Sequence, residues 1–186
     1  ARRQMRQWGV RVTYAWDTGL PIPLCSGIPD AWPHIRNLFA DAGFVADGGV
    51  EYIFGGELGA VPFPGVAPVD GACVHPAVSG TETTFVLRDH DGHIGRCECV
   101  ADLTRDGRLP AFAGWGKLEM LEVEAPWRNR GLGRWLVQHA VAWMREMGCT
   151  RIAFSVTPDD DARGAGRFYR RFGWERWLTL EKGWRA

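Results

Sequence analysis

Residues 118–134 read LEMLEVEAPWRNRGLGR, a stretch that combines a strand, a glycine turn and the beginning of a helix. Its first six residues alternate in the manner of a β-strand. Glycines at positions 131 and 133 follow a short connection. Glycine allows a tight turn and the close approach of a ligand to the backbone.

A helix is predicted from Leu132 to Met147, where apolar residues recur with helical spacing. The first N–H groups of a helix have no partners within it, and with the helix dipole they form an anion site suited to a phosphate or pyrophosphate. Arg128, Arg130 and Arg134 add local positive charge, and guanidinium groups match phosphate geometry. The sequence therefore predicts a phosphate site at this turn.

The glycine pattern differs from the two common nucleotide-binding loops. The dinucleotide pattern needs another glycine at its sixth place, and the mononucleotide loop needs Gly-Lys-Ser/Thr. Taken by themselves, these residues leave open a plain strand-to-helix turn with solvated arginines.

Three motifs together resemble the GNAT N-acetyltransferase superfamily. Arg128–Gly133 (RNRGLG) is similar to its Gln/Arg-x-x-Gly-x-Gly/Ala signature, and Leu121–Trp127 resembles its fourth strand and the exit from it. Phe168–Trp174 (FYRRFGW) resembles its Phe-Tyr-x-x-x-Gly-Phe box. The resemblance covers roughly residues 81–182 and implies an α/β (α+β) fold, with a mixed, mostly antiparallel sheet flanked by helices.

This resemblance implies transfer of an acetyl group from acetyl-coenzyme A (acetyl-CoA) to a primary amine, by direct attack in a ternary complex and with no metal. The pantetheine arm would lie along a splayed strand at Leu121, Glu122 and Val123, where a bulge is expected. A backbone N–H there could polarise the thioester carbonyl. The residues implied to hold the pyrophosphate are Arg128, Asn129, Arg130, Gly131, Leu132, Gly133 and Arg134.

Proton transfer would need a base and an acid. An alkylamine with a pKa of about 10.4 arrives protonated at neutral pH, so a carboxylate or a water chain should take its proton. Strand alternation places Glu119 and Glu122 on opposite faces unless a bulge intervenes, and we favour Glu119 as the base. For both, a solvated strand charge is the alternative. Tyr169 matches the family's tyrosine that protonates the leaving thiolate, with a packed aromatic ring as the alternative.

The sequence departs from the family pattern at one position. The family often has Asn seven residues before the tyrosine, and this chain has Ala162 there. A contact to the coenzyme would then be missing, or supplied by a neighbour such as Asp161.

The N-terminal part contains a degenerate echo of the C-terminal part. Residues 5–9, 10–16, 38–44 and 50–54 parallel residues 144–148, 152–156, 168–174 and 175–180 in order, although helix–glycine–strand is common in any α/β fold. The first copy lacks a phosphate loop and has Phe39 where the second has Tyr169. We therefore interpret residues 1–60 as a degenerate partial GNAT-like half of tandem type, residues 61–75 as a Pro/Gly-rich linker, and residues 76–186 as the catalytic domain that binds acetyl-CoA.

Composition limits the function classes. The chain has 186 residues, with 22 Lys+Arg against 22 Asp+Glu, so a general electrostatic hold on nucleic acid is not expected. No run approaches the roughly 18 apolar residues of a membrane span. The first residues contain neither an apolar signal core nor an initiating Met, as expected for a chain that begins inside a longer protein. Five scattered cysteines suggest a reduced cytoplasmic setting.

His90, His93, Cys97 and Cys99 are of metal-ligand type, but their spacing is not that of a standard zinc site, so no metal is predicted. The expected acceptor is a small-molecule or peptide amine. The strand after Trp174 could contribute to a homodimer. The alternative function is a non-catalytic acyl-CoA-binding or interaction module that has kept the fold.

Overall fold

The computed structural model describes residues 4, 7–9, 14–15, 27–104 and 109–186. The chain forms two compact units. Unit 1 contains Ala1–Ile53, Ser155–Ala165 and Arg176–Ala186, and unit 2 contains Phe54–Phe154 and Gly166–Glu175. The chain passes between the units inside strands β3 (Val50–Glu57), β8 (Arg151–Val156) and β9 (Glu175–Glu181) and after the first residue of helix α5 (Ala165–Arg170).

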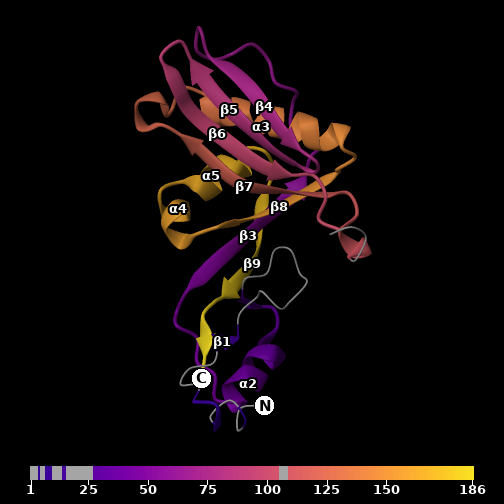
Figure 1. Ribbon diagram of the computed structural model, residues 1–186, viewed down its shortest axis with the longest axis vertical. Coiled ribbons are helices and arrows are strands. Elements are labelled where there is room, and N and C mark those ends of the chain that lie inside the picture. Colours follow the sequence, from indigo (N-terminus) through magenta and orange to yellow (C-terminus); the bar gives the residue numbers. More distant parts are fainter. Residues whose placement is uncertain (1–3, 5–6, 10–13, 16–26, 105–108) are drawn as a thin grey trace. The chain divides into compact units, whose positions relative to one another are not determined.

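Unit 2 is built on a mixed, mostly antiparallel sheet, as the sequence predicted (Figure 1). Its hydrogen-bonded order is β3-β8-β7-β6-β5-β4, with β7 and β8 parallel and the β4–β7 neighbours antiparallel. The strands are β3 (Val50–Glu57), β4 (Cys73–Ser79), β5 (Glu82–Asp89), β6 (Gly92–Val100), β7 (Trp115–Val123) and β8 (Arg151–Val156). The helical elements of unit 2 are η2 (Pro110–Phe112), η3 (Ala125–Trp127), α3 (Leu132–Glu146) and most of α5 (Ala165–Arg170).

Helix α3 covers one face of this sheet, and Figure 1 shows it behind β4, β5 and β6. Its apolar stripe is buried and contacts β5, β6 and β7. Because α3 connects two neighbouring strands, it makes the crossover that a parallel pair requires. The buried side chains of the helix are Leu132, Trp135, Leu136, Val137, Ala140, Val141 and Met144.

The compact units divide the chain at positions other than residues 60 and 75, and the sequence-based domain boundaries stay a prediction. The first division falls within β3, between Ile53 and Phe54, and the predicted linker residues 61–75 lie inside unit 2. Val61 is buried, and its carbonyl accepts a hydrogen bond from the Arg145 guanidinium at 2.7 Å. These contacts attach the segment after β3 to α3. The proposed duplication remains a prediction.

Among its described residues, unit 1 contains short strands and the helices α2 (Pro33–Asp41) and α4 (Pro158–Ala162). Strand β1 pairs antiparallel with β10, and β2 pairs antiparallel with β9, which neighbours β3. Lys182 Nζ lies 2.8 Å from Glu51 Oε1, and Arg36 forms an ion pair with Glu181. The elements are β1 (Tyr14–Ala15), β2 (Ile28–Pro29), α2 (Pro33–Asp41), α4 (Pro158–Ala162), β9 (Glu175–Glu181) and β10 (Trp184–Arg185).

In the part of the chain that the structure describes, every helix is too short or too polar to cross a membrane.

Candidate active site

The site begins where strand β7 separates from β8. The two strands pair only from Trp115 to Lys117, whereas the pairing with β6 continues to Val123. From Leu118 onward, one edge of β7 is therefore open within the described pairing. The sequence predicted this separation near Leu121–Val123, and the structure begins it at Leu118.

The open edge presents backbone groups from Leu121 and Val123. The N–H of Glu124 donates to the Ile94 carbonyl of β6 at 2.9 Å. Because residues of an antiparallel strand face alternate neighbours, Glu122 also faces β6, whereas Leu121 and Val123 face the open edge. The Val123 carbonyl there accepts a hydrogen bond from Arg128 Nε at 2.8 Å.

A β-bulge at Glu119 marks the opening. Glu98 of β6 pairs with Met120, but the next residue, Cys99, pairs with Leu118, so Glu119 is the extra residue. Bulges re-aim side chains and end regular pairing.

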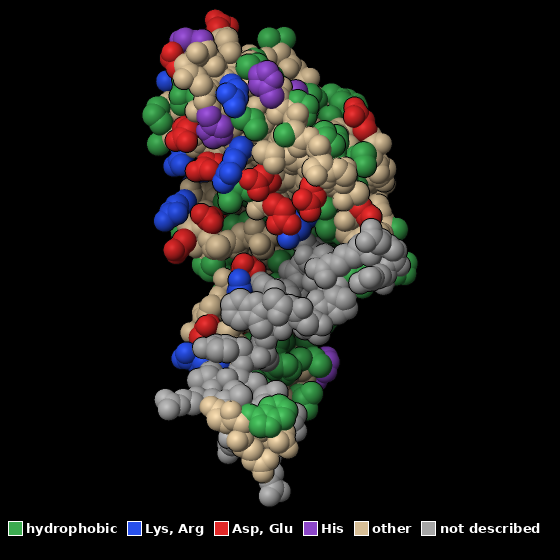
Figure 2. All heavy atoms as spheres, viewed as in Figure 1, with side chains coloured by type: hydrophobic (Ala, Val, Ile, Leu, Met, Phe, Trp, Pro, Cys, Tyr) green, Lys and Arg blue, Asp and Glu red, His purple; other side chains and the backbone are tan. Residues whose placement is uncertain are grey.

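The bulge also changes the facing of the two candidate bases. Simple alternation placed Glu119 and Glu122 on opposite faces, but the structure places both on the face opposite α3. Glu119 Oε1 lies 2.7 Å from Lys117 Nζ, and Glu122 Oε2 lies 3.7 Å from Arg96 Nε. Acidic and basic side chains gather on this face of unit 2 (Figure 2).

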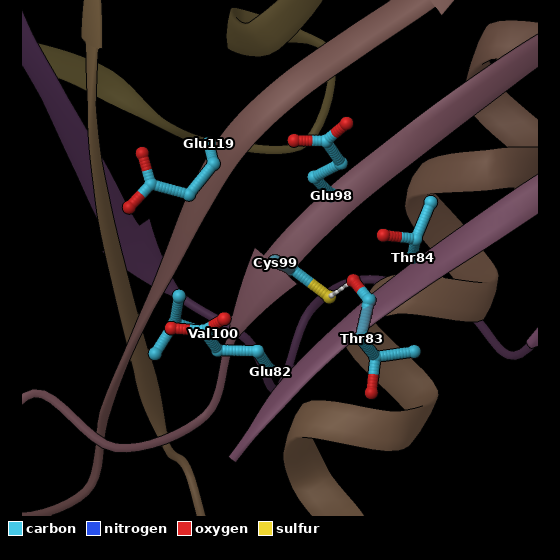
Figure 3. A pocket seen from close by; sticks show the side chains of 7 residues that line it. All are labelled: Glu82, Thr83, Thr84, Glu98, Cys99, Val100 and Glu119. Carbon is cyan, nitrogen blue, oxygen red and sulfur yellow. Dashed lines mark hydrogen bonds between the residues drawn. The ribbon is translucent and has the colours of Figure 1, made fainter. Parts of the chain in front are cut away.

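A shallow cavity of about 300 Å³ lies beside Glu119. Glu98 and Glu119 come from neighbouring strands and point to the same side of them (Figure 3). With Glu82, they give the cavity three carboxylates. The lining residues are Glu82, Thr83, Thr84, Glu98, Cys99, Val100 and Glu119.

The glycine turn leaves the beginning of α3 open. Gly131 is the N-cap residue with φ 84°, and no side chain caps the helix. Asn129 also has a positive φ of 62°, a conformation that Asn tolerates better than most residues. Both residues are exposed, so the first N–H groups of the helix can reach a ligand.

The side chains around this turn differ in their availability. Leu132 is 1% exposed, so only its backbone can contact a ligand. The Arg130 guanidinium carbon lies 5.1 Å from the centroid of the Trp127 ring. Arg128 Nε already donates a hydrogen bond to the Val123 carbonyl. Arg134, in the first turn of α3, is exposed. Together these groups fit a ligand with phosphate groups.

Tyr169 lies in an aromatic cluster of unit 2. It is 8% exposed, and its ring centroid lies 4.4 Å from that of Phe154 and 5.1 Å from that of Phe168. A Cβ built on Gly133 would lie 3.7 Å from the Phe168 ring and 3.8 Å from Val123 Cγ2. The aromatic box, the glycine turn and the end of β7 therefore meet at one place.

Comparison with known proteins identifies this arrangement. Residues 66–174 match the acetyltransferase (GNAT) family. The chain belongs to this family. The sequence motifs predicted a resemblance over roughly residues 81–182. The matched segment therefore both begins and ends closer to the N-terminus than expected.

One curated relative is N-alpha-acetyltransferase 30 of Schizosaccharomyces pombe, 29% identical over 99 residues. The alignment covers 53% of this chain and 61% of the relative, so the chain spans less than two thirds of that protein.

Two solved structures share the GNAT fold with this chain. A GCN5-related N-acetyltransferase from Sphaerobacter thermophilus has a TM-score of 0.57 and 17% identity, covering 86% of this chain and 58% of that one. A tandem GNAT protein from the clavulanic acid biosynthesis pathway has a TM-score of 0.64 and 11% identity, covering 99% of this chain and 66% of that one. At these identities the similarity shows the fold alone.

The family's Asn position lies in α4 of unit 1. Ala162 is the last residue of that helix and is exposed, and Asp161 precedes it. Thr157 caps the helix by accepting a hydrogen bond from the Asp160 N–H at 3.1 Å. A role for Asp161 toward the coenzyme stays a prediction.

The thiols near the site are poor nucleophiles. Burial raises the pKa of Cys97 well above its usual range, and it raises the pKa of Cys99 to about 12 and that of Cys149 to about 11. A reactive cysteine needs the thiolate form. His90 and His93 are exposed, whereas Cys97 and Cys99 are buried, so these four residues differ sharply in their access to solvent.

Sequence reasoning missed two features of this GNAT site. The left-handed conformation of Asn129 was not anticipated, although Asn is among the residues that adopt it most readily. Glu82 and Glu98 were not singled out, because their approach to Glu119 depends on strand register and on the bulge.

Proposed function

We propose that this chain transfers an acetyl group from acetyl-CoA to a primary amine, by direct attack in a ternary complex. The observation that carries the proposal is the uncapped beginning of α3 after Gly131, next to the open edge of β7. These two features supply an anion site and a strand edge that is not paired with β8, along which an extended thioester can lie.

The pyrophosphate of the coenzyme would lie at residues 128–134. There it would accept hydrogen bonds from the first backbone N–H groups of α3, and the helix dipole would favour its negative charge. Arg134 is exposed in the first turn and would add a charged contact.

The pantetheine arm and thioester would lie along Leu121–Val123. Backbone groups that face the open edge can hydrogen-bond the amides of the arm. An N–H from this edge would stabilise the oxyanion that forms when the amine attacks the thioester carbon.

Glu119 would take the proton of the attacking amine. Its Oε1 lies 2.7 Å from the Lys117 ammonium, so the attacking amine would compete with Lys117 for this carboxylate. As the C–N bond forms and the C–S bond breaks, Tyr169 would donate its phenolic proton to the leaving thiolate.

The cavity beside Glu119 supports an acceptor that carries positive charge. Three carboxylates line it, and cationic groups are attracted to such a surface. Two of the three are already ion-paired, Glu98 with Arg96 at 3.2 Å and Glu119 with Lys117 at 2.7 Å, which reduces this attraction. The name of the relative, N-alpha-acetyltransferase 30, supports a peptide α-amine as one such acceptor. A small-molecule amine fits the same chemistry.

We also propose that residues 1–60 derive from a degenerate GNAT-like half, connected through residues 61–75 to the catalytic residues 76–186. The similar fold of a tandem GNAT protein supports this interpretation. Lacking a glycine turn of the 128–134 type, the first half would not bind the coenzyme.

Calorimetric titration of coenzyme A into the chain tests the phosphate site. Arg134→Glu should weaken binding by at least about tenfold, because the new carboxylate repels phosphate. The same change favours the helix N-terminus, so stability should not fall. Arg185→Glu, in unit 1, makes an equal change of net charge and should leave the affinity near that of the wild type. Equal affinities in all three proteins would contradict the proposed site.

Glu119→Gln and Glu122→Gln test the base. Both glutamates are ion-paired on the same strand, so they are matched controls. Glu119→Gln should lower kcat/KM about 100-fold at pH 7, and the deficit should shrink near pH 10 as the free amine accumulates. The kcat/KM of Glu122→Gln should stay near that of the wild type.

The measurement is release of coenzyme thiol with simple monoamines, polyamines and peptides with a free α-amine. Binding of acetyl-CoA without turnover on any amine would favour the non-catalytic alternative.

A further inference from the structure

The turn between β5 and β6 gathers three side chains of metal-ligand type. Asp89, His90 and Asp91 each offer one donor atom, and these atoms all lie within 4.8 Å of one another. The proposed acetyl transfer uses none of them.

The carboxylate of Asp89 is held and buried. Its Oδ1 accepts hydrogen bonds from the N–H groups of Asp91 and Gly92, both at 3.0 Å. Its side chain is 1% exposed, and Oδ2 accepts no hydrogen bond from any residue in the described ranges. A buried oxygen without a partner costs about 1–3 kcal/mol, and more when charged. A positively charged partner at this oxygen would therefore stabilise the fold.

The imidazole of His90 stands between two carboxylates. Its Nδ1 lies 3.9 Å from Asp89 Oδ2, and its Nε2 lies 3.1 Å from Asp91 Oδ2. The side chains of His90 and Asp91 are 77% and 79% exposed, so both can rotate without disturbing the core. The Asp89 carboxylate would be a ligand in a fixed position. The side chains of His90 and Asp91 could move to complete the site.

We propose that Asp89, His90 and Asp91 bind a divalent transition-metal ion such as Zn²⁺, through one imidazole nitrogen and one oxygen from each carboxylate. Ligands around tetrahedral zinc at about 2.0–2.1 Å lie roughly 3.3 Å apart, so the cluster contracts on binding. Water completes the coordination. An imidazole ligand disfavours Mg²⁺ and Ca²⁺, which prefer oxygen. The ion neutralises the buried Asp89 oxygen and fixes the hairpin turn.

Calorimetric titration with Zn²⁺ tests the proposal. The full chain should carry Cys73→Ser, because Cys73 Sγ lies 3.2 Å from His75 Nε2 and this pair offers a second place for zinc. We expect saturable binding of one ion per chain and no saturable heat with Mg²⁺. No saturation with Zn²⁺, or equal binding of Mg²⁺, would overturn the proposal.

Three variants locate the ion. Asp89→Asn retains the oxygen that accepts the turn hydrogen bonds but removes the charge, and His90→Gln removes the imidazole. Each should weaken zinc binding by at least about tenfold. His93→Gln, an exposed histidine of β6 outside the cluster, should change nothing. Unchanged zinc affinity in His90→Gln, or loss of zinc affinity in His93→Gln, would refute the assignment.

Because His90 is exposed, its variant keeps the test valid even if Asp89→Asn does not fold. The visible spectrum of bound Co²⁺ gives a second readout, which should be lost in His90→Gln.

Discussion

The helix endings at residues 33–44 and 165–174 have the same local form and different surroundings. Gly43 and Gly173 have φ values of 77° and 79°. The Gly43 N–H donates to the Ala40 carbonyl at 2.8 Å, and the Gly173 N–H donates to the Arg170 carbonyl at 3.0 Å. Local sequence is therefore enough to set how both helices end.

The two endings differ in burial. Helix α2 has no buried residue among its described positions, and Leu38 is 62% exposed. In the second ending, Tyr169 and Phe172 are buried and Trp174 is fully buried. The same pattern thus supports a dense aromatic core in one place and a loosely covered helix in the other. Burial depends on the partners that each unit supplies.

Trp174→Ala should have the largest effect on stability. Its ring lies 5.0 Å from Phe172 and 5.6 Å from Phe154 between centroids, and its Nε1 donates to the Glu57 carbonyl at 3.2 Å. Removing a buried Trp costs about 3–5 kcal/mol. Urea unfolding followed by circular dichroism measures this loss.

Phe44→Ala is the matched change in the first ending. Phe44 is only half-buried, so its loss should cost less than the loss of Trp174, about 1 kcal/mol. Equal losses at the two positions would show that the contrast in burial has no energetic consequence.

Tyr169→Phe tests whether the second ending takes part in the reaction. It should lower kcat at least tenfold, equivalent to about 1.4 kcal/mol of barrier, and leave coenzyme affinity unchanged. The ring and its packing remain in this variant. Phe39→Tyr, the reciprocal change in the first ending, should alter neither quantity. Normal turnover in Tyr169→Phe would mean that the Tyr169 hydroxyl has no part in the reaction and that the residue serves only in packing.

The sequence was most informative where structure is local. The strand at 118–123, the turn at Gly131 and the helix that follows were all predicted from spacing, and the structure contains them. The turn between β5 and β6 is equally local, because Asp91-Gly92 is a dipeptide that favours tight hairpin turns. Each depends on backbone preferences of a few adjacent residues.

The sequence was least informative where distant strands decide the outcome. Two-residue alternation cannot show a bulge, so the common facing of Glu119 and Glu122 was not predicted. The unit boundary inside β3 also depends on pairing rather than on Pro and Gly content. The predicted roles of these glutamates and of Tyr169 concern a bound substrate, and they remain predictions.

The two glycine substitutions should cost about as much as Phe44→Ala, and the loss should be the same at both glycines. Gly43→Ala and Gly173→Ala each force an alanine into the left-handed region, at a cost of about 1 kcal/mol. A Cβ at Gly173 would meet no atom within 4 Å, so backbone strain is the whole expected cost there. Asn at either position should lose less, because Asn tolerates this conformation. Urea unfolding of the four variants measures the losses. A much larger loss at position 173 would mean that the surrounding core, and not the local φ value, determines how that helix ends.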